Sequence, residues 1–213
     1  MSASALAIVT APELKIDLGC GRQKRDGFVG VDIRAYDGVD VVVDLARDRW
    51  PWDDNSVTEA YASHIVEHLD DHAVELRQTT RELVVDGERV TVVTHAELVR
   101  HHERCHFFNE LHRVLKPSAK CLVITPHWAS NRAYGDPTHV WAPVSEFCFY
   151  YLSAEWRKTE APHCEPLFSC NFQAQWGYNP HPDLLVRAQD VQLYALANFK
   201  EAALDMVATL TKL

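Results

Sequence analysis

The stretch LKIDLGCGRQKRDGFVGVDI, residues 14–33, constrains the fold more than any other part of the chain. An apolar-alternating run, Lys15–Leu18, stops at Gly19-Cys20-Gly21, and a second run, Phe28–Ile33, carries Asp32 near its end. In a doubly wound sheet, ligands bind outside the carboxyl ends of the strands, where strand order reverses. The pattern therefore predicts two neighbouring strands whose ends meet at a ligand site.

The residue types at the two strand ends indicate an adenosine-containing ligand. Gly19 and Gly21 allow the backbone to approach a ligand closely, and Asp32 is placed to accept hydrogen bonds from a ribose diol. A glycine-rich turn followed by a solvated aspartate is the alternative. A dinucleotide site favours a third glycine and a full first helix, whereas this chain has Arg22-Gln23-Lys24-Arg25 and a short connection. S-adenosylmethionine, which has no pyrophosphate, fits better.

Strand-like and helical runs alternate along the rest of the chain. Further strands are predicted at Val39–Asp44, Val57–Ser63 and Cys121–Thr125, and a helix at roughly Ala96–Lys116, stopped by Pro117. The carboxyl-terminal region predicts a strand in residues 167–178, a helix in 186–199 and a closing strand in 204–213, the last pair antiparallel. The expected fold is α/β, a Rossmann-like doubly wound sheet of seven mostly parallel strands with an antiparallel last strand, in a single domain over residues 1–213.

One segment interrupts this alternation. ELVVDGERVTVV places two β-rich runs around Asp86-Gly87, a pair that type I′ hairpin turns prefer. We interpret residues 70–105 as an insertion, a helix plus a β-hairpin, within the sheet domain.

Composition narrows the functional classes. The net charge of −9 disfavours nucleic acid and anionic membranes as partners, and no apolar run is long enough to cross a bilayer. The stretch MSASALAIVTAPELK lacks the features of a signal peptide, and the six cysteines form no CxxC pair. We therefore expect reduced thiols and a cytoplasmic protein; a homodimer is possible.

Three blocks of the sequence resemble a known family. KIDLGCGRQKRDGFVGVDI, DLARDRWPWDDNSVTEAYASHIVEHL and FFNELHRVLKPSAKCLVITP look like the successive blocks of class I S-adenosylmethionine-dependent methyltransferases of the type-11 group. The chain departs from the family at Ser118-Ala119, where Gly-Gly is usual, and in its longer insertion. The resemblance implies methyl transfer with S-adenosylmethionine as cofactor. It also implies a cofactor site at Asp17, Gly19, Cys20, Gly21, Asp32, Ile33, Asp44, Leu45, Ser63 and His64.

Within that implied site, the residues divide by the part of the cofactor they contact. Asp17 and the Gly19–Gly21 loop, together with Ser63 and His64, match positions near the methionine portion. Asp32 matches the ribose acid. Asp44 and Leu45 match the block against the adenine.

Two histidine-rich segments raise the alternative of a metal site. HIVEH, His64–His68, matches the inverted zinc-protease pattern H-x-x-E-H, so a zinc hydrolase using His64, Glu67 and His68 is an alternative function. HHERCH offers the pairs His101 with Cys105 and His102 with His106, or simply a polar helix face. The methyltransferase block already accounts for HIVEH, and we predict no metal.

The aromatic connection YGDPTHVWAPVSEFCFYY, residues 134–151, is the candidate substrate wall. It follows a strand end, so it is expected to lie above the cofactor; a plain turn and packed aromatic helix is the alternative. The predicted catalytic group is His139 as base with Asp136 orienting it, and His68 as a further candidate.

Together these features predict a methyltransferase acting on a small-molecule or sugar-like acceptor at oxygen or nitrogen. A non-catalytic module that binds S-adenosylmethionine and acts through its hairpin is the alternative from a different class.

Overall fold

The computed structural model describes residues 13–213. The expectation that no signal peptide is present falls mainly on residues 1–12, which lie outside this range. Within the described part of the chain, no helix is long and apolar enough to span a membrane.

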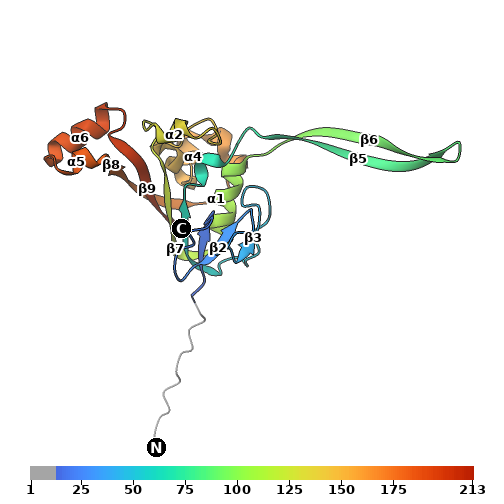
Figure 1. Cartoon of the computed structure of the whole chain (residues 1–213), viewed down its shortest axis with the longest axis horizontal. Coiled ribbons are helices and arrows are strands. Elements are labelled where there is room, and N and C mark those ends of the chain that lie inside the picture. The colour runs from blue at the N-terminus through green and yellow to red at the C-terminus, as the bar shows by residue number, and fades with distance from the viewer. Residues whose placement is uncertain (1–12) are drawn as a thin grey trace, which may run out of the picture.

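A seven-stranded sheet forms the centre of the molecule (Figure 1). Its strand order is β3-β2-β1-β4-β7-β9-β8, with β9 antiparallel to both of its neighbours and the pairs from β3 to β7 parallel. The strands are β1 (Lys15–Leu18), β2 (Val29–Asp32), β3 (Val41–Val42), β4 (Val57–Ser63), β7 (Leu115–Pro126), β8 (Phe172–Pro180) and β9 (Ala203–Lys212). The predicted Rossmann-like sheet with an antiparallel last strand is confirmed. Strand order reverses between β1 and β4, which places a ligand site at their carboxyl ends.

The helices lie mainly in the connections that follow β4 and β7. They are α1 (Glu103–Val114), α2 (Arg132–Gly135), α3 (Glu146–Tyr150), α4 (Ala154–Glu160), α5 (Pro182–Leu185) and α6 (Gln189–Asn198), with 3-10 turns η1 (Val66–His68) and η2 (Pro162–Leu167). The connection from β1 to β2 contains turns and no helix, as its length predicts.

The hydrophobic core joins α1 to the middle of the sheet. Phe108 and Leu111 of α1 are buried in one cluster with Ile16 of β1 and Ala60 of β4. Burying a side chain of this size stabilises the fold by roughly 1.5–3 kcal/mol. The core therefore fixes the strands whose ends form the candidate site.

The segment between η1 and α1 differs from the predicted helix plus hairpin. Two long antiparallel strands, β5 (Val74–Val85) and β6 (Glu88–Arg100), project from the sheet as a ribbon (Figure 1). Asp86 and Gly87 both have positive φ, 53° and 83°, so the predicted hairpin turn is confirmed. The predicted helix of the insertion is absent, because its residues belong to β5 or to the turn before it.

The predicted helix over Ala96–Lys116 is wrong at both ends. Ala96 to Arg100 belong to β6, where their backbone pairs with β5, and Leu98 is exposed rather than packed. At the other end the helix stops at Val114, and Pro117 lies inside β7. The register of β7 against β4 shifts in this region, which accommodates a residue without an N–H. Pro117 therefore marks a strand irregularity rather than the helix end.

The cysteines are unpaired, as expected from their spacing. Burial raises the pKa of Cys148 to about 11 and that of Cys170 to about 12. These thiols therefore stay protonated at neutral pH and contribute to packing.

Candidate functional site

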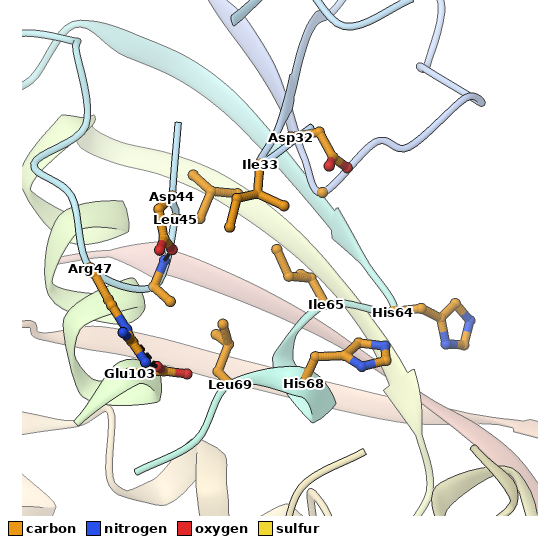
Figure 2. A pocket seen from close by; sticks show the side chains of 12 residues that line it. Asp32, Ile33, Asp44, Leu45, Arg47, His64, Ile65, His68, Leu69 and Glu103 are labelled. Atoms are coloured by element: carbon orange, nitrogen blue, oxygen red, sulfur yellow. Dashed lines mark hydrogen bonds and ion pairs between the residues drawn. The ribbon is translucent and has the colours of Figure 1, made fainter. Parts of the chain in front are cut away.

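A cleft of about 520 Å³ lies at the carboxyl ends of β1, β2, β3 and β4 (Figure 2). Its lining residues are Gly19, Asp32, Ile33, Asp44, Leu45, Ala46, Arg47, His64, Ile65, His68, Leu69 and Glu103. Six of the ten predicted cofactor residues are among them, along with His68 from the predicted catalytic group. The structure thus brings most of the predicted site together at the switch point of the sheet.

The Gly19 loop turns sharply between β1 and the rest of the cleft. Gly19 has φ +70°, and a Cβ atom there would lie 2.8 Å from Cδ1 of Ile65. Its amide donates to the Val31 carbonyl at 2.8 Å, which ties the loop to β2. Glycine is therefore favoured at this position both by backbone conformation and by the close contact with Ile65.

Asp32 is held in place by backbone amides on both of its carboxylate oxygens. Its Oδ2 accepts from the amide of Gly21 at 2.9 Å and its Oδ1 from the amide of Arg34 at 3.1 Å. A carboxylate offers about four lone-pair positions, so two bonds leave acceptor capacity toward the cleft. Asp32 is thus a fixed acceptor at the end of β2, as a ribose-binding acid must be.

Four predicted cofactor residues do not line the cleft. Asp17 is buried, and its Oδ2 accepts from the amide of Arg25 at 2.7 Å, so it fixes the loop from behind. Burial raises the pKa of this carboxyl. Cys20 is buried beneath the loop, Gly21 donates to Asp32, and Ser63 lies within β4. Their contribution to the cleft is to shape the loop and strand end.

The end of the cleft at β3 is polar and internally paired. Asp44 accepts from the amide of Ala46 at 2.9 Å, which orients its carboxylate beside Leu45. Arg47 donates to Oε1 of Glu103 through Nε at 3.0 Å and Nη2 at 2.8 Å. Figure 2 shows this ion pair on the same side of the cleft as Asp44. The cation that lines this end is therefore already neutralised.

His64 lies at the opposite end of the cleft, and its ring points away from Asp44 (Figure 2). Its backbone has φ 55°, a left-handed conformation uncommon for a residue other than glycine. Its Nδ1 lies 3.1 Å from Oε1 of the buried Glu67, and this hydrogen bond raises the pKa of His64. The strand end thus carries a histidine oriented by a buried carboxylate.

The predicted catalytic residues form a group next to the cleft. The rings of His68 and His139 are in edge contact, with centroids 4.7 Å apart. Asp136 Oδ2 lies 3.9 Å from Nε2 of His139, while Nδ1 of His139 faces the Ala133 carbonyl at 3.2 Å. The ring is therefore oriented by Ala133, and Asp136 faces the other nitrogen. A role of Asp136 in orienting His139 stays a prediction, and the structure shows that it would act at Nε2, opposite the nitrogen that faces Ala133.

The cleft contains residues that the sequence did not single out, among them Arg47, Ile65, Leu69 and Glu103. Arg47 and Ile65 lie within two positions of the predicted residues Leu45 and His64. A prediction that included the sequence neighbours of those residues would have contained both. Glu103 lies in the first turn of α1, and only the tertiary fold brings it to Arg47.

The histidine motifs do not form the metal pairs considered as an alternative. His64 to His68 include only a 3-10 turn, and His64 is bonded to Glu67. His101 precedes α1 and its Nε2 binds Oε2 of Glu75 at 2.8 Å, while His106 faces the Asp48 carbonyl. The protease pattern therefore lacks the helix that it requires.

No protein-family model matches the sequence, and no curated protein matches it. Among solved structures, the chain is similar to a SAM-dependent methyltransferase from Archaeoglobus fulgidus, with 18% identity over 94% of this chain and 86% of the other, and a TM-score of 0.58. A SAM-dependent methyltransferase from Methanosarcina mazei is similar at 13% identity over 94% and 92% of the two chains, with a TM-score of 0.51. These likenesses show that the fold is the one adopted by class I S-adenosylmethionine-dependent methyltransferases. Membership of the type-11 group stays a prediction.

Proposed function

We propose that this chain, which has the class I methyltransferase fold, binds S-adenosylmethionine in the cleft and transfers its methyl group to a small molecule. The observation that carries the proposal is Asp32, whose carboxylate is fixed at the end of β2 beside the Gly19 loop. A cleft of about 520 Å³ is within the size range of small-ligand sites.

The charges around the cleft favour this cofactor over a dinucleotide. Asp32 and Asp44 line the cleft, and among the described lining residues Arg47 is the one permanent cation, paired with Glu103. A pyrophosphate needs unpaired donors or a helix amino terminus. A ligand with a sulfonium and an ammonium group suits acidic surroundings better.

The lining residues suit different parts of the proposed ligand. Asp32 would accept from the ribose hydroxyls, and Asp44 from the adenine amine beside the apolar side chains of Ile33 and Leu45. The Gly19 loop and the His64 strand end would hold the methionine portion. When bound, the cofactor supplies an activated methyl group, and transfer depends mainly on alignment of the acceptor.

For an acceptor hydroxyl or protonated nitrogen, a group must take the proton. We propose His139, with His68 beside it, as that group. The Ala133 carbonyl favours a proton on Nδ1 of His139, which leaves Nε2 free to accept one. Asp136, 3.9 Å from that nitrogen, would stabilise the charged ring.

An apolar cavity supports the choice of a small acceptor. Residues of the aromatic connection, including Phe147 and Tyr151, line a cavity of about 420 Å³ together with Phe108 and Phe168. The segment that separates it from the cleft is short: Leu69 lines the cleft, and Asp71 lines the cavity. We propose that an acceptor with an apolar or sugar-like face reaches the cofactor from this side.

Calorimetry with S-adenosylmethionine, S-adenosylhomocysteine and NAD tests the cofactor directly. We expect both adenosyl ligands to bind with one site per chain and NAD not to bind. No binding of either adenosyl ligand at millimolar concentration would overturn the proposal, and binding of NAD alone would favour a dehydrogenase.

The exposed valines of the projecting hairpin favour one rival, a module that binds the cofactor but works through a partner. Release of S-adenosylhomocysteine separates the two. We expect turnover with the small-molecule filtrate of a cell extract, whereas a module would bind the cofactor and release no product with any fraction.

A further inference from the structure

Three side chains of metal-ligating type meet beside the cleft. Glu67, His68 and His139 each offer one donor atom, and these atoms lie within 4.8 Å of one another. The two segments involved are tied together, because the amide of Val140 donates to the Glu67 carbonyl at 3.0 Å. The group is therefore a fixed feature of the fold rather than a chance approach of mobile side chains.

The hydrogen bonds of both histidine rings favour a tautomer that leaves Nε2 available to a metal. Nδ1 of His139 lies 3.2 Å from the Ala133 carbonyl, and Nδ1 of His68 lies 3.3 Å from the Thr138 carbonyl. A carbonyl only accepts, so each of these contacts favours a proton on Nδ1 and a lone pair on Nε2. The Thr138 hydroxyl also lies 3.1 Å from Nδ1 of His68, and because it donates to Oδ1 of Asp136 at 2.7 Å it can accept from that nitrogen. Metal-binding histidines are typically oriented in this way, with the second ring nitrogen donating to a carbonyl or carboxylate.

The third donor is a buried carboxylate with capacity to spare. Oε1 of Glu67 faces Nδ1 of His64, and Oε2 accepts from the Thr125 hydroxyl at 3.2 Å. Two of about four lone-pair positions are then used. Glu67 is buried, and a bound metal ion would place a second positive group beside it in addition to His64.

We infer that Glu67, His68 and His139 bind a first-row divalent metal ion such as Zn²⁺ through one carboxylate oxygen and two Nε2 atoms. Two histidines and a carboxylate with open positions are a donor set that zinc and iron(II) accept. With bonds of about 2.1 Å, donor atoms at the 4.8 Å limit would have to draw closer together around the ion. The inference departs from the sequence-based expectation of no metal and uses a different set from the HIVEH histidines, because His139 replaces His64.

The ion would change what the two histidines do. A ring nitrogen that binds a metal cannot also take a proton, so in the metal-bound protein His68 and His139 would act as ligands. The base role proposed above for His139 would then apply only to the metal-free protein. Because His68 also lines the cleft, the open positions of the ion would be available to an acceptor hydroxyl, whose pKa the ion would lower.

The test uses the full chain stripped with a chelator and titrated with Co²⁺ and with Zn²⁺ alone, followed by calorimetry and by Co²⁺ absorption. We expect one equivalent to bind. His68→Ala and His139→Ala should each weaken binding by more than the roughly 10- to 100-fold typical of losing a supporting contact. His95→Ala, on the exposed hairpin, is the control and should bind as the wild type does.

His102→Ala provides the discriminating variant, because a second group of donors, Asp71, His102 and Cys105, also lies within 4.8 Å. Loss of binding in His102→Ala with retention in His139→Ala would overturn the inference. The inference would also be overturned if the wild type bound no metal at millimolar concentration. It would be overturned as well if the His68→Ala/His139→Ala double variant still bound one equivalent of metal. Thermal unfolding of each variant verifies that it is folded. Binding of S-adenosylhomocysteine without metal binding would refute this inference alone and leave the proposed function intact.

Discussion

The two sides of the cleft are assembled in different ways. Asp32 is fixed by the amides of Gly21 and Arg34, neighbours in the same strand-turn-strand stretch. His68 and His139 come from segments that the hairpin, α1 and β7 separate, and a backbone bond from Val140 to Glu67 joins them. The first side is a local structure that can hold a ligand by itself, whereas the second depends on the tertiary fold. Binding and turnover should therefore be separable by mutation.

The largest expected effect is on the histidine side. His139→Asn removes the Nε2 lone pair that faces Asp136, whether that nitrogen takes a proton or holds an ion. We expect turnover to fall about 10²–10⁴-fold, the usual contribution of a positioned general base. Affinity for S-adenosylhomocysteine should stay the same, because His139 does not line the cleft. The measurement is product release with the small-molecule filtrate, paired with calorimetry.

The control for this variant is His163→Asn, which changes an exposed histidine of η2 that lines neither cavity. Its turnover should match that of the wild type. Equal turnover of His139→Asn and wild type from pH 6 to 9 would remove the catalytic assignment, and a parallel loss of cofactor affinity would show that the two sides are not independent.

On the Asp32 side, the expected effect is smaller and falls on binding. Asp32→Ala removes the acceptor for the proposed ribose hydroxyls, and hydrogen bonds to charged groups contribute about 1.5–3 kcal/mol, or roughly 10- to 100-fold in affinity. Calorimetry with S-adenosylhomocysteine measures this. Asp53→Ala, an exposed aspartate before β4, should bind normally. If the two variants bind equally well, Asp32 is not a ligand-binding residue.

Two glycines of the loop beside Asp32 test how far local backbone conformation alone determines the structure of the cofactor side of the cleft. Gly21→Ala introduces only an unfavourable backbone conformation, since φ is +53° and, apart from the adjacent residues, no atom of residues 13–213 lies within 4 Å of the added Cβ; the cost is about 1–2 kcal/mol. Gly19→Ala adds a clash with Ile65 at 2.8 Å, and overpacking costs a further ~1–3 kcal/mol. Urea unfolding should therefore show a smaller loss of stability for Gly21→Ala than for Gly19→Ala. Cofactor affinity should fall only for Gly19→Ala, because Ile65 lines the cleft. The reverse ranking would contradict the geometry.

The same contrast explains what could be predicted from the sequence. The Gly19 loop, Asp32 and the Asp86-Gly87 turn are governed by local backbone rules, and the structure has each where the sequence places it. Strand β4 was predicted with its observed bounds because apolar alternation and a buried face coincide there. These features need no knowledge of distant residues.

Elements that depend on distant partners were predicted less well. Ala96 to Arg100 have helical spacing, but pairing with β5 makes them a strand, and no short-range signal reveals that partner. The Arg47–Glu103 pair and the meeting of Glu67 with His139 depend on how α1 and the aromatic connection pack. The nitrogen of His139 that Asp136 faces could not be predicted, because closeness in sequence does not fix the direction of a ring.

The smallest expected effect comes from a change that touches neither side of the cleft. Val74 and Arg100 are paired at the base of the hairpin, and the amide of His101 donates to the Ala73 carbonyl at 2.8 Å. Replacing residues 75–99 by Asn-Gly should therefore close the chain with a tight turn while Asp70 and Glu103 keep their contact. We expect affinity for S-adenosylhomocysteine within about 2-fold of wild type, because the residues that line the cleft all lie outside 75–99. Lost affinity in a shortened chain that still unfolds cooperatively would show that the hairpin supports the cleft. Retained affinity with lost turnover would show that the hairpin helps to bind the acceptor or a partner. Like His68 and His139, it would then serve turnover rather than cofactor binding.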